Sequence, residues 1–113
     1  MHELAVTRSL IDLVDREARR QGFQRALEIR LKLGAYSGIV PECILDLFPY
    51  AARGTAAEGA ALVFETVPAR FTCRGCGWEG EIEKGGDACP RCQSTALTMT
   101  QGREFYVDSL KVE

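Results

Sequence analysis

The chain has 113 residues, five cysteines, one histidine and a formal net charge of −2. This length suffices for one compact domain, or for a small domain joined to a metal-stabilised module. It contains no apolar run long enough to span a membrane and no secretory leader, since charges occur throughout residues 1–21. We therefore expect a cytoplasmic protein without a membrane partner, in a compartment where thiols stay reduced.

Residues 4–21 have the pattern of an amphipathic helix, with apolar side chains on one half of a helical projection and charged side chains on the other. Two pairs of opposite charge at a spacing of four, Asp12 with Arg16 and Asp15 with Arg19, support a helix. Gly22 is a suitable stop. We interpret the charge run from Arg16 to Arg20 as a solvated face and not as a binding patch. The expected core side consists of Leu4, Val6, Leu10, Ile11, Leu13, Val14 and Ala18.

Residues 27–33 alternate between aliphatic and charged side chains, which predicts a half-buried strand. Its core side would carry Leu27, Ile29, Leu31 and Leu33. Pro41 can open a second helix, because apolar residues follow it at helical spacing. Pro49 is expected to kink this helix or to limit it to a short first part.

Two further strands are predicted beyond the second helix. Residues 61–67 are apolar at nearly every position, which favours a central strand. Residues 104–112 form a third strand whose alternation breaks at Asp108 and Ser109, where a bulge or a register change would fit.

Four of the cysteines form two Cys-x-x-Cys pairs. Two such turns supply four sulfurs, which suits tetrahedral Zn²⁺. The alternatives are two disulfides, which need an oxidising compartment, or a redox dithiol, in which one pair would open a helix. A four-sulfur site is closed, so its metal would be structural and its binding free energy would be folding free energy. The cysteines concerned are Cys73, Cys76, Cys89 and Cys92; Cys43 is expected to be buried in the second helix.

These elements predict an α+β fold: a three-stranded sheet with two helices on one face, plus an inserted zinc-ribbon-like module. The expected domains are a discontinuous α/β domain, residues 1–69 with 99–113, and a zinc-binding domain, residues 70–98. The second has four basic and four acidic side chains, which argues against a nucleic-acid partner. It has little apolar core and should lose its structure without metal.

The single histidine, His2, occupies the second position of the chain. The α-amine of Met1, the amide nitrogen of His2 and its imidazole can chelate one metal ion, and the amide of Glu3 completes four nitrogens in a plane. Planar nitrogen sets suit Ni²⁺ or Cu²⁺ better than Zn²⁺. The alternative is a histidine that stands at this position by chance.

The start Met1-His2-Glu3-Leu4, the two cysteine pairs and the ending Gly102-x-Glu104 … Ser109-Leu110-x-Val112-Glu113 resemble the HypA/HybF family, the nickel metallochaperones of [NiFe]-hydrogenase maturation. The resemblance covers the whole chain in order. It implies no enzyme activity, a nickel-binding domain and a separate zinc domain. It further implies that transported Ni²⁺ is bound by His2 with Glu3 beside it, and that structural Zn²⁺ is bound by Cys73, Cys76, Cys89 and Cys92.

The same resemblance implies two protein partners, the maturation GTPase HypB and the hydrogenase large-subunit precursor. It leaves open whether the chain forms a homodimer and whether urease is also served. Two departures from the family pattern stand out. Some members have an acidic residue where Val40 aligns here; the nearest carboxylate is Glu42, which could also serve as a first-turn helix acid. Some members have histidines beside the cysteine pairs, where this chain has Gly77 and Gln93, so we expect no histidine ligand exchange.

Three other functions compete with this interpretation. The strongest is a zinc-ribbon adaptor that binds protein or nucleic acid, although the neutral module lacks clustered aromatic side chains. A second is a protein–protein scaffold in which His2 is incidental. An enzyme is disfavoured, because the sequence has no Ser/His/Asp or Cys/His set.

Overall fold

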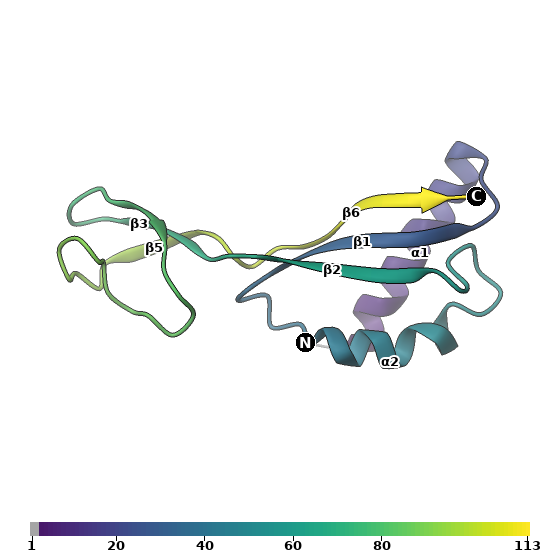
Figure 1. Ribbon diagram of the computed structural model, residues 1–113, viewed down its shortest axis with the longest axis horizontal. Helices are drawn as coiled ribbons and strands as arrows, with labels where there is room; N and C mark the ends of the chain where they lie inside the picture. Colours follow the sequence, from purple (N-terminus) through teal and green to yellow (C-terminus); the bar gives the residue numbers. More distant parts are fainter. Residues whose placement is uncertain (1–2) are drawn as a thin grey trace. The chain divides into compact units, whose positions relative to one another are not determined.

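The computed structural model describes residues 3–113, and Figure 1 shows its helices and strands. In chain order the elements are α1 (Glu3–Gln21), β1 (Ala26–Gly34), α2 (Pro41–Ala51), β2 (Ala61–Val67), β3 (Arg70–Cys73), β4 (Glu79–Glu81), β5 (Leu97–Gln101) and β6 (Phe105–Val112). The strands form two three-stranded sheets, in the orders β2-β1-β6 and β4-β3-β5. The predicted α+β fold is confirmed, with the cysteine-containing sheet inserted between β2 and β6. Within residues 3–113, no helix combines the length and apolar character that a membrane span requires.

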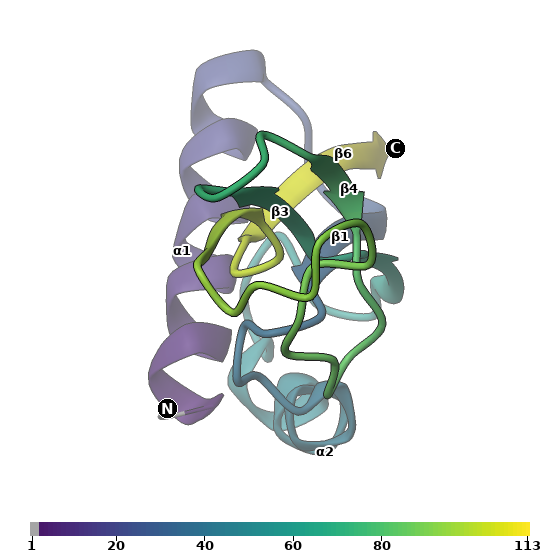
Figure 2. The ribbon, with the colours of Figure 1, turned by 90° about the vertical axis from the view of Figure 1, so that its left-hand side faces the viewer.

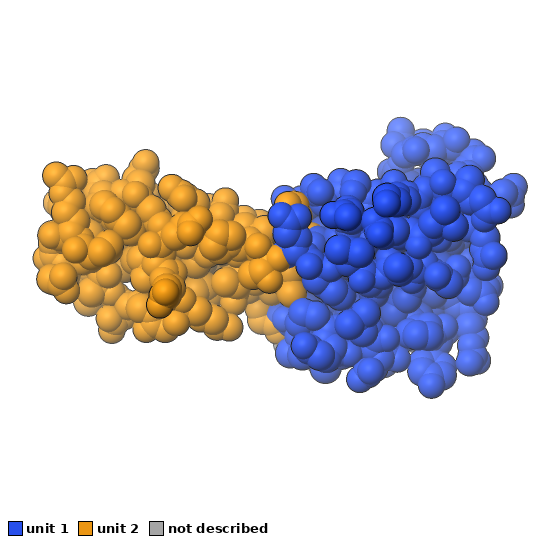
Figure 3. All heavy atoms as spheres, in the orientation of Figure 1, with its two compact units in different colours: residues 1–31, 39–65, 106–113 blue, residues 32–38, 66–105 orange. Residues whose placement is uncertain are grey.

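The chain divides into two compact units, coloured separately in Figure 3. Unit 1 contains the chain up to Leu31, together with Ile39–Glu65 and Tyr106–Glu113. Unit 2 contains Lys32–Gly38 and Thr66–Phe105. The residues of the first sheet are therefore divided between the two units, whereas the second sheet lies entirely within unit 2.

Helix α1 begins one residue before its predicted start and ends where expected. Gly22 adopts a φ of 79°, and its N–H donates to the Ala18 carbonyl at 2.8 Å, as a glycine after a helix end does. The core side also differs in detail, because Thr7 is fully buried while Leu4 is 44% exposed. The Thr7 hydroxyl donates to the Glu3 carbonyl at 2.7 Å, which satisfies its polar atom inside the helix.

Arg16, Arg19 and Arg20 are exposed as expected, but Asp15, just before this charge run, contacts a distant loop. The Asp15 carboxylate accepts a hydrogen bond from the Ala56 N–H at 2.8 Å, in the loop that precedes β2. Asp15 is half-buried, and this contact anchors the loop to the helix. The ion pair nearest to it along the helix joins Glu17 to Arg20 at 2.6 Å.

Strand β1, not β2, is the centre of the first sheet. Ile29 and Leu31 are fully buried and Leu33 nearly so. The apolar run in β2 lies at an edge, where its residues are half-buried or exposed, so the predicted central position of residues 61–67 is wrong. Leu27 has the right alternation but is 51% exposed near the start of β1, because alternation sets the face and not the depth.

Strands β1 and β6 pair antiparallel. Gly34 donates to the Glu104 carbonyl at 2.7 Å at one end, and Glu113 donates to the Arg25 carbonyl at 3.0 Å at the other. The two strands advance by the same number of residues between these bonds. The burial alternation in β6 does shift at Asp108 and Ser109, but this irregularity adds no net residue to either strand.

Helix α2 packs against α1, and both helices cover one face of the first sheet (Figure 2). Its core side chains are Ile44 and Phe48. The helix continues to Ala51 despite Pro49, so the prediction that proline limits it to a short first part is wrong. Cys43 is exposed and not buried, because it stands about 100° around the helix from Ile44.

Candidate metal centre

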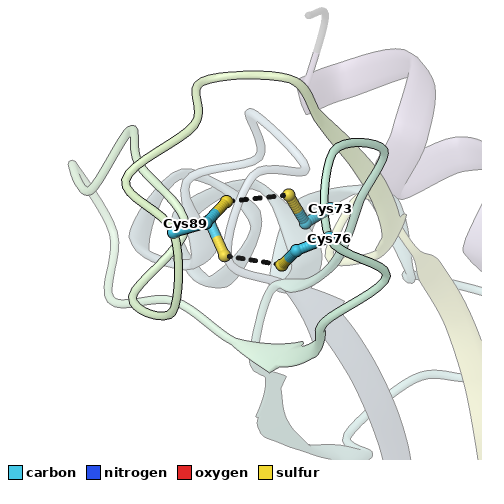
Figure 4. A group of neighbouring side chains, drawn as sticks. Cys73, Cys76 and Cys89 are labelled. Atoms are coloured by element: carbon cyan, nitrogen blue, oxygen red, sulfur yellow. Dashed lines mark hydrogen bonds between the residues drawn. The ribbon is translucent and has the colours of Figure 1, made fainter.

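Four cysteine side chains converge in unit 2. Cys73 is the last residue of β3, Cys76 lies in the turn that follows, and Cys89 and Cys92 lie in a second turn before β5. Their Sγ atoms all lie within 4.8 Å of one another. Figure 4 shows these sulfurs directed towards one another from the two turns. The structure therefore brings together all four cysteines that the spacing had singled out.

The two turns have the same backbone hydrogen-bond pattern. In the first, the Cys73 carbonyl accepts from Gly77 at 2.9 Å and the Cys73 N–H donates to Trp78 at 2.7 Å. In the second, the Cys89 carbonyl accepts from Gln93 at 2.8 Å and the Cys89 N–H donates to Ser94 at 2.8 Å. Each turn thus folds back on its first cysteine and holds its sulfurs on one side.

A left-handed residue closes each turn at the same position. Gly77 has a φ of 81° and Gln93 a φ of 65°. Gln93 is the one non-glycine residue with positive φ in residues 3–113. Gly75, two residues before Gly77, does not adopt a positive φ. The equivalent role of Gln93 was not foreseen, since glutamine has no preference for this conformation.

The sulfur separations fit a tetrahedral metal. Cys73 Sγ lies 3.7 Å from Cys92 Sγ, and Cys76 Sγ lies 3.7 Å from Cys89 Sγ. Four thiolates about 2.3 Å from a central Zn²⁺ would be about 3.8 Å apart. Bonded sulfurs in a disulfide would be about 2.05 Å apart, and all four thiols are free. The donor set and its spacing therefore fit one metal ion and leave no position for a fifth protein ligand.

The thiols differ in acidity. The backbone N–H of Cys76, helped by that of Gly75, lowers the pKa of Cys73 to about 6. The N–H of Ser94 also favours the Cys92 thiolate, but desolvation and the three neighbouring cysteines outweigh it and raise the pKa of Cys92 to about 12. The Cys73 thiol is therefore ionised more readily than that of Cys92.

Side chains outside the cysteines brace the loops around the site. Arg74 donates through Nη1 to the Leu97 carbonyl at 3.2 Å and to Thr98 Oγ1 at 2.9 Å. The Tyr36 hydroxyl accepts from the Gly85 N–H at 2.9 Å, and Lys84 Nζ lies 5.7 Å from the Tyr36 ring centroid. Sequence reasoning missed Tyr36, since nothing local links it to a loop so far along the chain.

The expected nickel ligands Met1 and His2 lie outside the described residues. Glu3, the third, is the first residue of α1 and is half-buried. Val40 precedes α2 without a side-chain cap, and Glu42 lies exposed in the first turn of that helix. An exposed acid in the first turn suits the helix dipole.

Fold and site together define a small α+β protein with a four-sulfur metal site in an inserted sheet. The family described as "Hydrogenase/urease nickel incorporation, metallochaperone, hypA" matches residues 1–112. The chain belongs to this family, whose members are maturation factors and not catalysts.

Relatives and solved structures agree. The hydrogenase maturation factor HypA of Chlorobium limicola is 37% identical over 113 residues, covering 100% of this chain and 97% of the relative. That of Geobacter metallireducens is also 37% identical, with 100% of both chains covered. The solution structure of the Ni metallochaperone HypA from Helicobacter pylori matches with a TM-score of 0.73 and 22% identity, over 99% of this chain and 97% of that chain. This last likeness shows a shared fold.

Proposed function

We propose that this chain is a cytoplasmic nickel metallochaperone that binds Ni²⁺ at its N-terminus and delivers it to the precursor of the [NiFe]-hydrogenase large subunit. The observation that carries the proposal is the family match over residues 1–112, which includes the Met-His-Glu start. The nickel-binding domain comprises residues 1–69 and 99–113, and the zinc-binding domain residues 70–98. The GTPase HypB is the proposed partner in nickel supply.

In this proposal the nickel ligands are the α-amine of Met1, the amide nitrogen and imidazole of His2, and the amide of Glu3. One feature of α1 supports the last of these. Glu3 is the first helical residue, and the first N–H groups of a helix have no acceptor within the helix. Its nitrogen can therefore turn to a metal without breaking a hydrogen bond of α1. A planar set of nitrogens favours Ni²⁺ over Zn²⁺.

The second metal of the proposal is structural Zn²⁺, bound by Cys73, Cys76, Cys89 and Cys92. The sulfur separations of 3.7 Å support it. Bound zinc supplies no reaction; it joins the two turns that carry the cysteines. In this proposal nickel is bound at the N-terminus, where a receiving protein can reach its ligands, and zinc is bound at a closed site.

The test is a calorimetric nickel titration of zinc-loaded, untagged protein. Two variants accompany it: His2→Gln, and a chain with two residues added before Met1. The extension removes the terminal amine while keeping every side chain. A third variant, Glu42→Gln, tests whether the carboxylate in the first turn of α2 contributes to nickel binding. We expect tight binding of one Ni²⁺ in the wild type and at least tenfold weaker binding, about 1.4 kcal/mol, in His2→Gln and in the extended chain. Equal nickel affinity in the wild type, His2→Gln and the extended chain would contradict the terminal chelate.

A further inference from the structure

A groove lies between α1 and β6 in unit 1, and none of the residues proposed to bind metal lines it. Its volume is about 360 Å³. One wall is a stripe of α1 side chains at a spacing of four residues, Leu13, Glu17 and Gln21. The other wall is β6, from Val107 to Leu110 and at Val112. Side chains from two elements thus line the same groove.

The β6 side of this groove is an open sheet edge. The sheet order β2-β1-β6 leaves β6 paired on one side, and Figure 1 shows it at the margin of the sheet. An edge strand presents backbone N–H and C=O groups in a row, which another extended chain can complete. Four of the lining side chains are apolar and at least partly accessible: Leu13, Val107 and Leu110 are half-buried, and Val112 is 42% exposed.

The charges of the groove favour a basic segment as its occupant. Its lining includes two carboxylates, Glu17 and Asp108, and no basic side chain. Glu17 already accepts hydrogen bonds from Arg20 and Gln21. Asp108 is exposed, and within residues 3–113 no ion pair joins it to a basic side chain. A basic residue on an incoming strand would therefore meet an acidic edge with an unpaired carboxylate.

We propose that this groove is a docking site for an extended segment of a partner protein, which adds to β6 as a further strand. The segment would alternate apolar residues, directed towards Leu13 and Val107, with basic residues that meet Asp108. Backbone hydrogen bonds to β6 would supply affinity, and the side chains would supply selectivity. This surface goes beyond nickel binding, since it contains none of the proposed metal ligands.

The test uses a short blocked peptide of alternating valine and lysine. Its backbone nitrogens are methylated along one edge, so that it can pair through the other edge but cannot grow into fibrils. We expect it to shift the backbone amide resonances of residues 107–112 in the full-length, zinc-loaded protein. A peptide methylated on both edges has the same side chains but cannot pair, and we expect it to leave those resonances unchanged. Equal shifts with both peptides, or no binding at millimolar peptide, would overturn the proposal.

Charge reversal provides the second arm. Asp108→Lys should weaken binding of the lysine peptide about three- to tenfold, because an exposed pair is lost and a repulsion is added. The matched control is Asp12→Lys, which makes the same charge change on an exposed part of α1 outside the groove. It should leave binding unchanged. An equal loss in both variants would mean diffuse attraction to an acidic protein and would also overturn the docking site.

Discussion

Gln93 adopts the left-handed conformation that glycine adopts at the equivalent position of the other cysteine turn. Its φ of 65° closes the turn and allows its N–H to reach the Cys89 carbonyl at 2.8 Å. A residue branched at Cβ tolerates this conformation poorly, with a cost of about 1–2 kcal/mol. The backbone of one exposed residue is thus part of what holds Cys89 and Cys92 in one turn.

We therefore expect Gln93→Val to lower the free energy of unfolding of the zinc-loaded protein by about 1–2 kcal/mol, and Gln93→Gly to cause no such loss. Chemical denaturation followed by circular dichroism would measure both. Thr95→Val is the matched control, because Thr95 is exposed nearby and lacks a positive φ. Equal effects of the two valine substitutions would show that left-handed strain is not the cause.

The acidity of the cysteines predicts how zinc binding depends on pH. Zinc binds thiolates, so a proton held by any ligand opposes binding. Cys73, with a pKa of about 6, is already ionised at neutral pH, whereas Cys92, with a pKa of about 12, still has to release its proton. Affinity should thus fall as pH falls, and fall more steeply below about pH 6, where Cys73 also becomes protonated. Competition with a chromophoric chelator from about pH 8 to about pH 5 would measure this, and a flat profile would contradict it.

At the level of elements, the end of β1 passes very close to the chain that leads into β6. A Cβ atom built on Gly34 would overlap the Gly102 carbonyl, which itself accepts from the Tyr36 N–H at 2.7 Å. The Ala35 N–H donates to the Val67 carbonyl at 3.0 Å in the same region. Three segments far apart in sequence therefore meet where one residue lacks a side chain.

Gly34→Ala should consequently destabilise the protein by about 2–3 kcal/mol, since backbone atoms must move apart. Gly38→Ala is the comparison: Gly38 has a φ of 77° but nothing within 4 Å of the added methyl group. It should cost about 1 kcal/mol through backbone strain alone. Thermal unfolding of both variants would measure the difference. A Gly34→Ala variant no less stable than Gly38→Ala would show that the backbone around Gly34 and Gly102 can move apart at little cost.

At the scale of the whole molecule, the two units depend on metal to different degrees. Unit 1 contains most of the buried core, including Val14, Ile29 and Ile44, each with no exposed surface. In unit 2 the fully buried side chains are Cys73 and Cys89, which are themselves candidate ligands. Such a module has little buried apolar surface to stabilise it when the metal is absent.

We expect Cys73→Ala to release zinc and to unfold residues 70–98, while α1, α2 and β1 keep their structure. Hydrogen exchange resolved along the chain would detect this as lost protection confined to residues 70–98. Cys43→Ala is the matched control, since Cys43 is an exposed thiol outside the cluster and its loss should leave zinc in place. Loss of protection throughout the chain would show that the two units do not fold separately.

Much of this architecture could be inferred from local patterns. Helix α1 ends just before Gly22, because glycine tolerates the left-handed turn there. The alternation of residues 27–33 identified the inner face of β1. The cysteine spacing identified the four converging sulfurs, because each Cys-x-x-Cys turn is a local structure that places both sulfurs on one side. The family resemblance rested on the two cysteine pairs together with the start Met1-His2-Glu3-Leu4 and the motif at the end of the chain.

What local patterns could not decide was the depth and pairing of these elements, since both depend on contacts between distant residues. An apolar run reads as a central strand, yet the sheet order makes β2 an edge and β1 the centre. Thr7 is buried, Leu27 and Cys43 are exposed, and Asp15 and Tyr36 bind loops that lie 41 and 49 residues further along the chain. Periodicity sets the face on which a side chain lies, but only the packed neighbours determine whether that face is covered.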